Sequence, residues 1–531
     1  MAQGRSVTLA RSGLVSSPHY LSAMAGVRIL EAGGNAIDAA IAANAVLNVV
    51  QPHGCGTGGD LFMLIYDAKS DGLYGLNGSG RSPAAATPDW FKANGHEVMP
   101  QRGILPVTVP GVVDGWQMAI DRFGKLSMDK VLKPAIRYAE KGFGVGPNLH
   151  VALENILKQT WRHDSWRAVY APDGKAPAEG SILKLPDLAH ALTQIGDKGR
   201  DAFYKGKIAR ALVEFSEKEG GLFTLEDLAE HQGEWVDPLS ISYHGYTIYE
   251  MPPNTHGLSA LQMLKLVEGL ELGKKFTTPE AIHYMVEAKK LAFADRAAYI
   301  TDPAFMKVAP ERLLDEDYIA TRRALIDSQK PMVSIAPGSF EGDTIYLCAA
   351  DGKGNAVSLI QSNYMGVGSG LVVPGWGIEL QNRGAYFSLD PAHPNCIAPR
   401  KRTMHTLIPS MAFRNSKPEI IFGTMGGDGQ PQIHLQVYTD LINFGMNIQA
   451  AIEAPRWIHG KGMPDQSEGL QVETRFSPRV LGALSRLGHP IQRVGAWNSA
   501  MGYAQGIVIN QENGLLMGGA DPRADSAAIG Y

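Results

Sequence analysis

The chain has 531 residues, of which 44% are hydrophobic and 19% are charged, and its formal net charge is −4. This length allows one large core or two to four domains of ordinary size. Because lysine and arginine form no basic block and the charge balance is mildly acidic, the composition argues against a nucleic-acid partner.

The first twenty residues contain no continuous apolar stretch of the length that a secretory signal needs. No later apolar run is long enough to span a bilayer. The three cysteines, Cys55, Cys348 and Cys396, have the spacing of neither a disulfide framework nor a metal site. These observations predict a cytoplasmic protein with no membrane association.

Apolar residues recur with helical spacing from His19 to Val50, and residues 31–35 interrupt them with a helix stop and a cap. The second predicted helix is apolar on nearly every side, so we expect it to be buried. A glycine-rich stretch, residues 52–60, then precedes a predicted strand over residues 61–66. The order helix, loop, strand is opposite to that of nucleotide-binding loops, so this stretch favours close backbone packing or a site.

Arg81 stands alone in the turn-rich segment 77–83. An isolated surface arginine is ordinarily solvated, but a guanidinium on a loop shaped by glycine and proline also suits bidentate capture of a carboxylate. Farther along, a helix is predicted over residues 279–300, half exposed because it carries several charges. His283 and Glu287 lie one turn apart on it, and without a third ligand they are interpreted as a surface pair rather than a metal site.

The sequence after Pro303 is rich in loops until Thr344, where an apolar, β-branched run begins. Residues 351–355 supply turn residues and residues 356–360 form a second apolar run, so a hairpin is predicted with Thr344 at its start. A threonine in this position is ordinarily only a strand residue. The alternative is a nucleophile, and a threonine hydroxyl then needs a neighbouring base.

A threonine can carry its own base if the chain is cut immediately before it. The freed α-amine has a pKa of roughly 7.7–8.0, whereas a peptide nitrogen cannot accept a proton. Under this hypothesis the chain is a precursor that cleaves its own Asp343–Thr344 bond, and the loop before that bond supplies the accessible backbone. Downstream, Gly426-Gly427 could aim two N–H groups at an oxyanion, or could form an ordinary tight turn.

Several motifs along the chain occur together in the order typical of one enzyme family. They are residues 33–40, the loop 56–62, Arg81, Val109-Pro110-Gly111, Met251-Pro252-Pro253, Thr344 with its hairpin, Gly426-Gly427 and Asp521-Pro522-Arg523. Together they resemble the γ-glutamyltranspeptidase family nearly end to end. The resemblance implies an α+β fold, the four-layer αββα sandwich of the N-terminal-nucleophile hydrolases. It also implies self-cleavage into a large chain, residues 1–343, and a small chain, residues 344–531, which together complete one sandwich.

The resemblance also assigns roles to individual residues. Thr344 resembles the nucleophile, and Gly426 and Gly427 resemble the oxyanion donors. Arg81 resembles the arginine that holds the α-carboxylate of the γ-glutamyl group. Ser362 falls where the family often has a second threonine bonded to the nucleophile, so a hydroxyl is kept. The implied reaction is acyl transfer from an amide through an acyl-enzyme to water or another amine, and it calls for no cofactor or metal.

Five positions depart from the family pattern. Where family members hold the glutamyl α-amino group with a glutamine and an aspartate, this sequence has Arg383 and Tyr386. The family's paired serines correspond to His405 and Thr406, and an asparagine of the pocket corresponds to Tyr364. An arginine in place of an acid would repel the ammonium group of glutamate.

Two enzymatic functions follow from the resemblance. The broader expectation is release of γ-glutamyl groups from glutathione-like compounds. Arg383 favours instead an acylase or amidohydrolase that acts on monoamides of dicarboxylic acids lacking the amino group, glutaryl- or oxamate-like. The segment 387–400 is too short for the lid loop of some family members, which favours hydrolysis over transfer.

An alternative of another class is a non-catalytic binding protein on the same fold. The retained Thr344, Gly426 and Gly427 argue against it. The expected partners of the enzyme are a small amide substrate and the two pieces of its own chain, and assembly into a homo-oligomer stays open.

Overall fold

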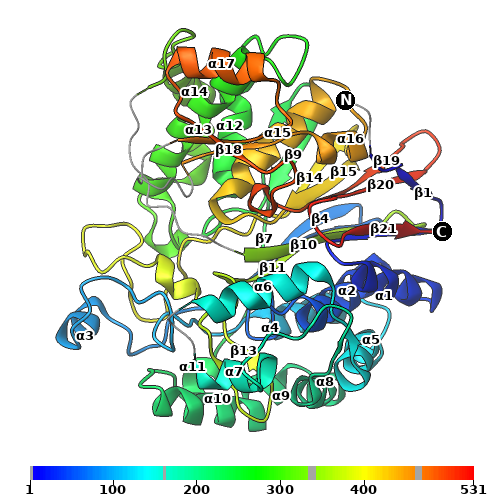
Figure 1. The fold of residues 1–531 in the computed structure, drawn as a ribbon, viewed down its shortest axis with the longest axis vertical. Helices are drawn as coiled ribbons and strands as arrows, with labels where there is room; N and C mark the ends of the chain where they lie inside the picture. The colour runs from blue at the N-terminus through cyan, green and yellow to red at the C-terminus, as the bar shows by residue number, and fades with distance from the viewer. Residues whose placement is uncertain (1–3, 160–162, 333–342, 461–468) are drawn as a thin grey trace.

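The computed structural model describes residues 4–159, 163–332, 343–460 and 469–531. Within these residues, two seven-stranded sheets lie face to face, and helices cover the outer side of each (Figure 1). The first sheet has the order β21 (Ala527–Gly530), β2 (Gly13–Ser17), β10 (Asp343–Asp351), β11 (Ala356–Tyr364), β3 (Asp60–Asp67), β4 (Gly72–Gly78) and β7 (Glu234–Val236). The second has the order β1 (Thr8–Ala10), β20 (Leu516–Ala520), β19 (Ala504–Ile509), β15 (Lys417–Thr424), β14 (Ser410–Arg414), β9 (Tyr246–Glu250) and β8 (Leu239–Tyr243).

Three apolar layers join these elements. One lies between the sheets, where Phe62 and Tyr346 of the first sheet meet Met411 and Ile421 of the second. Another lies between the first sheet and its helices, and the third lies between the second sheet and its helices. The helices on the second sheet include α12 (Gly257–Glu268), α13 (Pro279–Tyr299), α15 (Gln430–Ile442), α16 (Ile448–Glu453) and α17 (Pro478–Leu487). The predicted αββα sandwich is therefore confirmed.

The helices nearest the first sheet are α1 (Tyr20–Glu31) and α2 (Ala36–Val50). The break between them lies where the sequence predicts it, and Asn35 caps α2 by accepting hydrogen bonds from two backbone N–H groups while Asp38 bonds back to the cap. Every residue of α2 is buried, because the helix packs between the sheet and α5 (Met128–Lys141). Helix α8 (Pro186–Lys198) in turn packs on α5.

Helix α13 is mostly buried, and its buried residues include most of its charged ones, so the prediction of a half-exposed helix is wrong. Its charged residues are paired with distant parts of the chain: Arg296 lies 2.8 Å from Asp428, and Asp295 lies 2.9 Å from Arg322. Burying an unpaired charge is costly, but a paired one is tolerated. The partners were not visible in the helix's own sequence.

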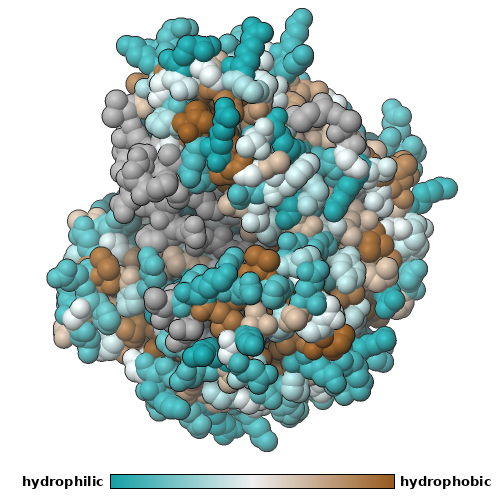
Figure 2. All heavy atoms as spheres, viewed as in Figure 1, coloured by the Kyte–Doolittle hydropathy of each residue, from teal (hydrophilic) through white to brown (hydrophobic). Residues whose placement is uncertain are grey.

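The hairpin of β10 and β11 occupies the centre of the first sheet, where β2 and β3 flank it. No helix within the described part of the chain is long and apolar enough to cross a membrane. On the face shown in Figure 2, apolar side chains lie in small separate groups among polar ones. Strand β10, which carries Thr344, thus lies between two neighbouring strands in the buried centre of the first sheet.

Candidate active site

Thr344 is the second residue of β10 and is 2% exposed. The pairing of β10 with β11 shifts at this point, because Asp343 lies opposite Tyr364 whereas Ile345 lies opposite Gln361. Two residues of β11, Ser362 and Asn363, therefore face one residue of β10, which is the pattern of a β-bulge. Such bulges redirect side chains beside active sites.

The bulge brings the hydroxyl groups of Thr344 and Ser362 together. Thr344 Oγ1 donates a hydrogen bond of 3.1 Å to Ser362 Oγ, which also accepts one of 2.6 Å from the backbone N–H of Tyr364. Tyr364 has a φ of +79°, a conformation that non-glycine residues seldom adopt and that costs about 1–3 kcal/mol. The local chain is thus strained in a way that fixes the hydroxyl pair.

The two predicted oxyanion donors lie in the turn that joins β15 to α15. Gly426 and Gly427 have φ values of +138° and +52°, so this turn requires glycine. Just before the turn, a methyl group added at Gly423 would collide with the ring of Tyr346, two residues beyond Thr344. The end of β15 therefore packs directly against the start of β10. The role of the two N–H groups at an oxyanion stays a prediction.

The structure also gathers the five residues at which the sequence departs from the family pattern. The Arg383 guanidinium lies 4.3 Å from the centre of the Tyr364 ring, and its Nη1 donates a hydrogen bond of 3.0 Å to Thr406 Oγ1. The rings of Tyr364 and Tyr386 lie 4.8 Å apart. Since Tyr364 N bonds to Ser362, this group is connected directly to the Thr344 hydroxyl pair.

Asp60, which sequence reasoning did not select, lies at the centre of this group. Its Oδ2 lies 3.0 Å from His405 Nε2 and 3.7 Å from Arg383 Nε, and its Oδ1 accepts a hydrogen bond from Gly80 N. It also lies opposite Ser362 in the pairing of β3 with β11. The available signal was an acid placed directly after two glycines at the start of an apolar strand.

Burial sets the charge of these groups. It raises the pKa of Asp60 to about 6, although the Arg383 guanidinium opposes the rise. Burial also lowers the pKa of His405 well below its usual range, and the positive charge of Arg383 lowers it further. His405 is therefore neutral at pH 7. Its Nδ1 accepts a bond from Leu407 N, so Nε2 carries the proton and donates to Asp60.

A second ion pair, between Arg296 and Asp428, lies beside Tyr386 of this group. Asp428, next to Gly427, accepts a hydrogen bond of 2.7 Å from the Tyr386 hydroxyl and pairs with Arg296 of α13. Burial would raise the pKa of Asp428, but the Arg296 guanidinium holds it below its usual value. His256 connects this ion pair to Thr406, because its Nε2 lies 2.9 Å from Thr406 O and its Nδ1 lies 3.3 Å from Arg296 Nη1.

Arg81 follows Gly80, whose N–H bonds to Asp60, and its side chain is paired with an acid. Its Nη2 lies 2.6 Å from Glu234 Oε1, and the same carboxylate lies 2.7 Å from Arg402 Nη1. Arg81 also lines a pocket of about 230 Å³ together with His231 and Arg400. The structure thus places Arg81 in an ion-pair group with Glu234 and Arg402, and its role at a substrate carboxylate stays a prediction.

His283, Glu287 and His489 form a group with possible metal-ligand spacing within the described residues. All three are buried, so the interpretation of the first two as a surface pair is wrong. The two histidine rings are bonded at 2.8 Å, and Glu287 accepts hydrogen bonds from Lys290 Nζ and Met332 N. Because an ammonium group already neutralises Glu287, we interpret the group as a hydrogen-bonded core cluster.

The comparisons with known proteins agree with this architecture. A family model described as Gamma-glutamyltranspeptidase matches residues 22–531. The chain is 42% identical to a glutathione hydrolase-like proenzyme, YwrD, of Bacillus subtilis, over 97% of this chain and 98% of the relative. It is 36% identical to the oxamate amidohydrolase proenzyme of Klebsiella pneumoniae, over 98% of each.

Among solved structures, the cephalosporin acylase of Bacillus halodurans superposes with a TM-score of 0.94 at 43% identity, covering 100% of this chain and 98% of that one. A match that extends over almost the full length of each protein shows common ancestry, and it includes the strand that carries Thr344. The chain therefore belongs to the γ-glutamyltranspeptidase family and is a self-processing amidohydrolase with the N-terminal-nucleophile hydrolase fold.

Proposed function

We propose that the chain cleaves its own Asp343–Thr344 bond and that the mature enzyme hydrolyses monoamides of dicarboxylic acids that lack an α-amino group. Thr344 is the nucleophile, and residues 344–531 form the small chain. The proposed substrate class rests on one observation, the burial and incomplete hydrogen bonding of the Arg383 guanidinium. This side chain is 1% exposed, and among the described residues its Nη2 atom has no hydrogen-bond partner, whereas its Nε atom faces the Asp60 carboxylate at 3.7 Å.

Buried guanidinium N–H groups without partners favour binding of an anion, because an unmade hydrogen bond in the interior is costly. Both carboxylates of the group already face cations: Asp60 lies beside Arg383, and Asp428 is paired with Arg296. An ammonium group would have to compete with these arginines for either acid. The distal carboxylate of a glutaryl- or oxamate-like acyl group would instead approach Arg383 Nη2 and share the guanidinium charge with Asp60.

Self-cleavage follows from the position of Thr344. Its hydroxyl oxygen attacks the carbonyl carbon of Asp343, the bond from that carbon to the Thr344 nitrogen breaks, and the nitrogen gains a proton. Water then hydrolyses the resulting ester and releases the large chain, residues 1–343. The residues that precede the bond, 333–342, lie outside the described residues. Cleavage converts the peptide nitrogen into an α-amine, which can act as a base near neutral pH.

In the mature enzyme, the α-amine accepts the hydroxyl proton while Thr344 Oγ1 attacks the substrate amide carbon. The amine of the substrate leaves with that proton, and water hydrolyses the acyl-enzyme in a second step. The N–H groups of Gly426 and Gly427 are the proposed donors to the oxyanion in both steps. Ser362 holds the nucleophile in place through its 3.1 Å hydrogen bond.

A second candidate is hydrolysis of γ-glutamyl amides such as glutathione. It is supported by the name of the B. subtilis relative, a glutathione hydrolase-like proenzyme, and it is the broader expectation of the family resemblance. The names of the oxamate amidohydrolase and of the cephalosporin acylase support the first candidate. Transfer to an amine acceptor is a variant of either reaction.

The test begins with the intact mass of the purified protein and of Thr344→Ala. We expect two chains divided before residue 344 in the parent and one uncut chain in the variant, while Thr344→Ser keeps a nucleophile and is cut. Turnover of glutaryl and γ-glutamyl p-nitroanilides then distinguishes the two candidates. A preference for the γ-glutamyl compound would refute the proposed acyl group. An uncut, inactive parent would refute the mechanism and support the binding-protein alternative.

A further inference from the structure

A surface groove lies between helices α1 and α5, on the outer side of the first helical layer. It encloses about 500 Å³, which is within the range of pockets that bind small molecules. Its floor is apolar and is formed by Ala25, Ile29, Leu126 and Pro134. The catalytic group described above contributes none of the residues that line it.

The rim of the groove is strongly basic. Arg28, Lys130, Lys133 and Arg137 line it, and the lining contains no aspartate or glutamate. No ion pair involves any of these four cations within the part of the chain that the structure describes, and the nearby Glu140 pairs with Lys141. Asp129 offsets part of the charge of Lys130, but four cations around one apolar pocket are unexpected in a chain whose net charge is −4.

Helix dipoles do not account for all of these cations. Arg28 lies in the last turn of α1, where a positive charge is favourable. Lys130 instead lies in the first turn of α5, where the dipole disfavours a positive charge, and Lys133 lies beyond that turn, where the dipole gives a cation no advantage. Their position is better explained by a ligand that carries negative charge.

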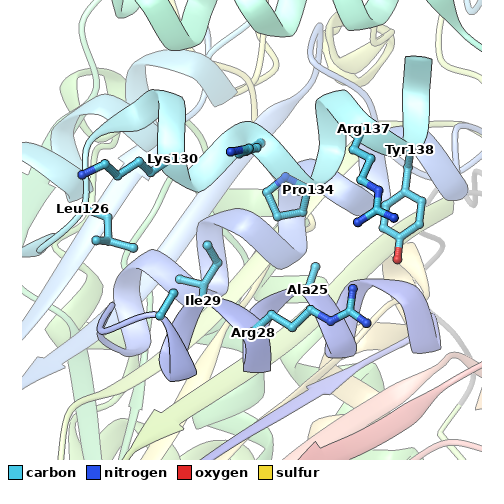
Figure 3. A pocket seen from close by; sticks show the side chains of 10 residues that line it. Ala25, Arg28, Ile29, Leu126, Lys130, Pro134, Arg137 and Tyr138 are labelled. Atoms are coloured by element: carbon cyan, nitrogen blue, oxygen red, sulfur yellow. The ribbon is translucent and has the colours of Figure 1, made fainter. Parts of the chain in front are cut away.

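The groove has two different ends (Figure 3). The guanidinium groups of Arg28 and Arg137 lie near the hydroxyl of Tyr138 at one end, and Ile29 and Pro134 lead from there toward Leu126 and Lys130 at the other. From Lys130 to Arg137 the helix rises about 10 Å, at about 1.5 Å per residue. A ligand with one anionic head and an apolar tail matches this arrangement.

We propose that the groove binds a free amphipathic carboxylate, of which a medium-chain fatty acid is the simplest example. The two arginines and Tyr138 bind the carboxylate, and the apolar floor covers the hydrocarbon tail. A concave pocket with a single polar end fits one such molecule. A lipid bilayer would instead require a projecting apolar surface.

The experiment is a calorimetric titration of the mature enzyme with octanoate at low ionic strength. We expect one saturable site outside the active site, which is retained in Arg383→Met. The double variant Arg28→Gln/Arg137→Gln should bind roughly tenfold more weakly, since each exposed ion pair contributes modestly. The matched control Lys207→Gln/Lys218→Gln removes the same charge from the exposed face of α10 (Lys207–Lys218) and should bind octanoate like the parent.

Two further titrations measure separately how much the carboxylate head and the hydrocarbon tail of the ligand contribute to binding. Hexanoate should bind more weakly by about fourfold for each methylene group removed, and 1-octanol should lose the contribution of the arginines. Turnover of the glutaryl anilide should be the same in the groove variant and the parent. Absence of octanoate binding, equal binding by the groove variant and the parent, or binding only to anionic vesicles or to an acidic peptide would each overturn the proposal.

Discussion

The substitution Arg383→Met tests the proposed substrate class most directly. In the parent, the two N–H bonds of the buried Arg383 Nη2 group are available to a carboxylate, and a hydrogen bond to a charged group contributes about 1.5–3 kcal/mol. Losing both should cost about 3–6 kcal/mol, which lowers kcat/KM for glutaryl p-nitroanilide by roughly a hundredfold to ten-thousandfold. The uncharged butyryl p-nitroanilide has no distal carboxylate, so its kcat/KM should change little.

The ratio of the two kcat/KM values is the informative quantity, because it does not depend on the amount of folded enzyme. The substitution also leaves Asp60 without its cation, and breaking a buried ion pair costs about 3–5 kcal/mol of folding stability. Arg456→Met is the matched control, since Arg456 is equally buried and lies 2.8 Å from Asp521. It should lose similar stability but keep the parent's preference. An unchanged glutaryl to butyryl ratio in Arg383→Met would refute the assignment of Arg383 to the acyl pocket.

Three further predictions concern Ser362, Asp60 and Arg81. Ser362→Ala removes the hydrogen bond to Thr344 and should slow both self-cleavage and turnover by about two- to tenfold. Ser362→Thr keeps a hydroxyl and should preserve both rates. Equal rates for the two variants, measured as a time course of intact mass, would argue against this contact. Because burial raises the folded pKa of Asp60 from 3.8 to about 6, the native state favours its protonated form, and stability from this group is lost as pH rises from about 4 through 6. Asp60→Asn should therefore gain stability relative to the parent by about 3 kcal/mol between pH 4 and 7, as measured by urea unfolding, and a pH-independent difference would contradict the pKa. Arg81→Ala should lower kcat/KM for glutaryl p-nitroanilide only a few fold, because this side chain is half exposed and already paired with Glu234. A hundredfold loss would show that Arg81 contacts the substrate.

The helices and strands that the sequence predicts correctly are specified by residues close together along the chain. The break between α1 and α2 is encoded by Gly33 and Gly34 and by the capping box of Asn35 and Asp38, all within one short stretch. The hairpin of β10 and β11 likewise follows from two apolar runs and the turn between them. These are local interactions, so they can be predicted without knowing the fold.

The order of the motifs along the chain identified the fold and the family. No single motif among those around Arg81, Thr344 and Gly426 identifies a fold, but their joint order predicted the αββα sandwich and the family, and both are confirmed. The gathering of Tyr364, Arg383 and Thr406 beside the hydroxyl pair is consistent with the roles that the resemblance suggested. The roles themselves await the experiments above.

What only the tertiary structure decided is the pairing of polar and charged groups that are distant in sequence. Asp60 and His405 are 345 positions apart, and Arg296 and Asp428 are 132 apart, yet each pair is in contact. Charged and polar residues are ordinarily exposed, and for that reason the sequence predicts a half-exposed α13. Folding buries them instead because each group meets a partner from a distant part of the chain. This pairing, which no local pattern records, determines which charged groups of the site remain available to a substrate.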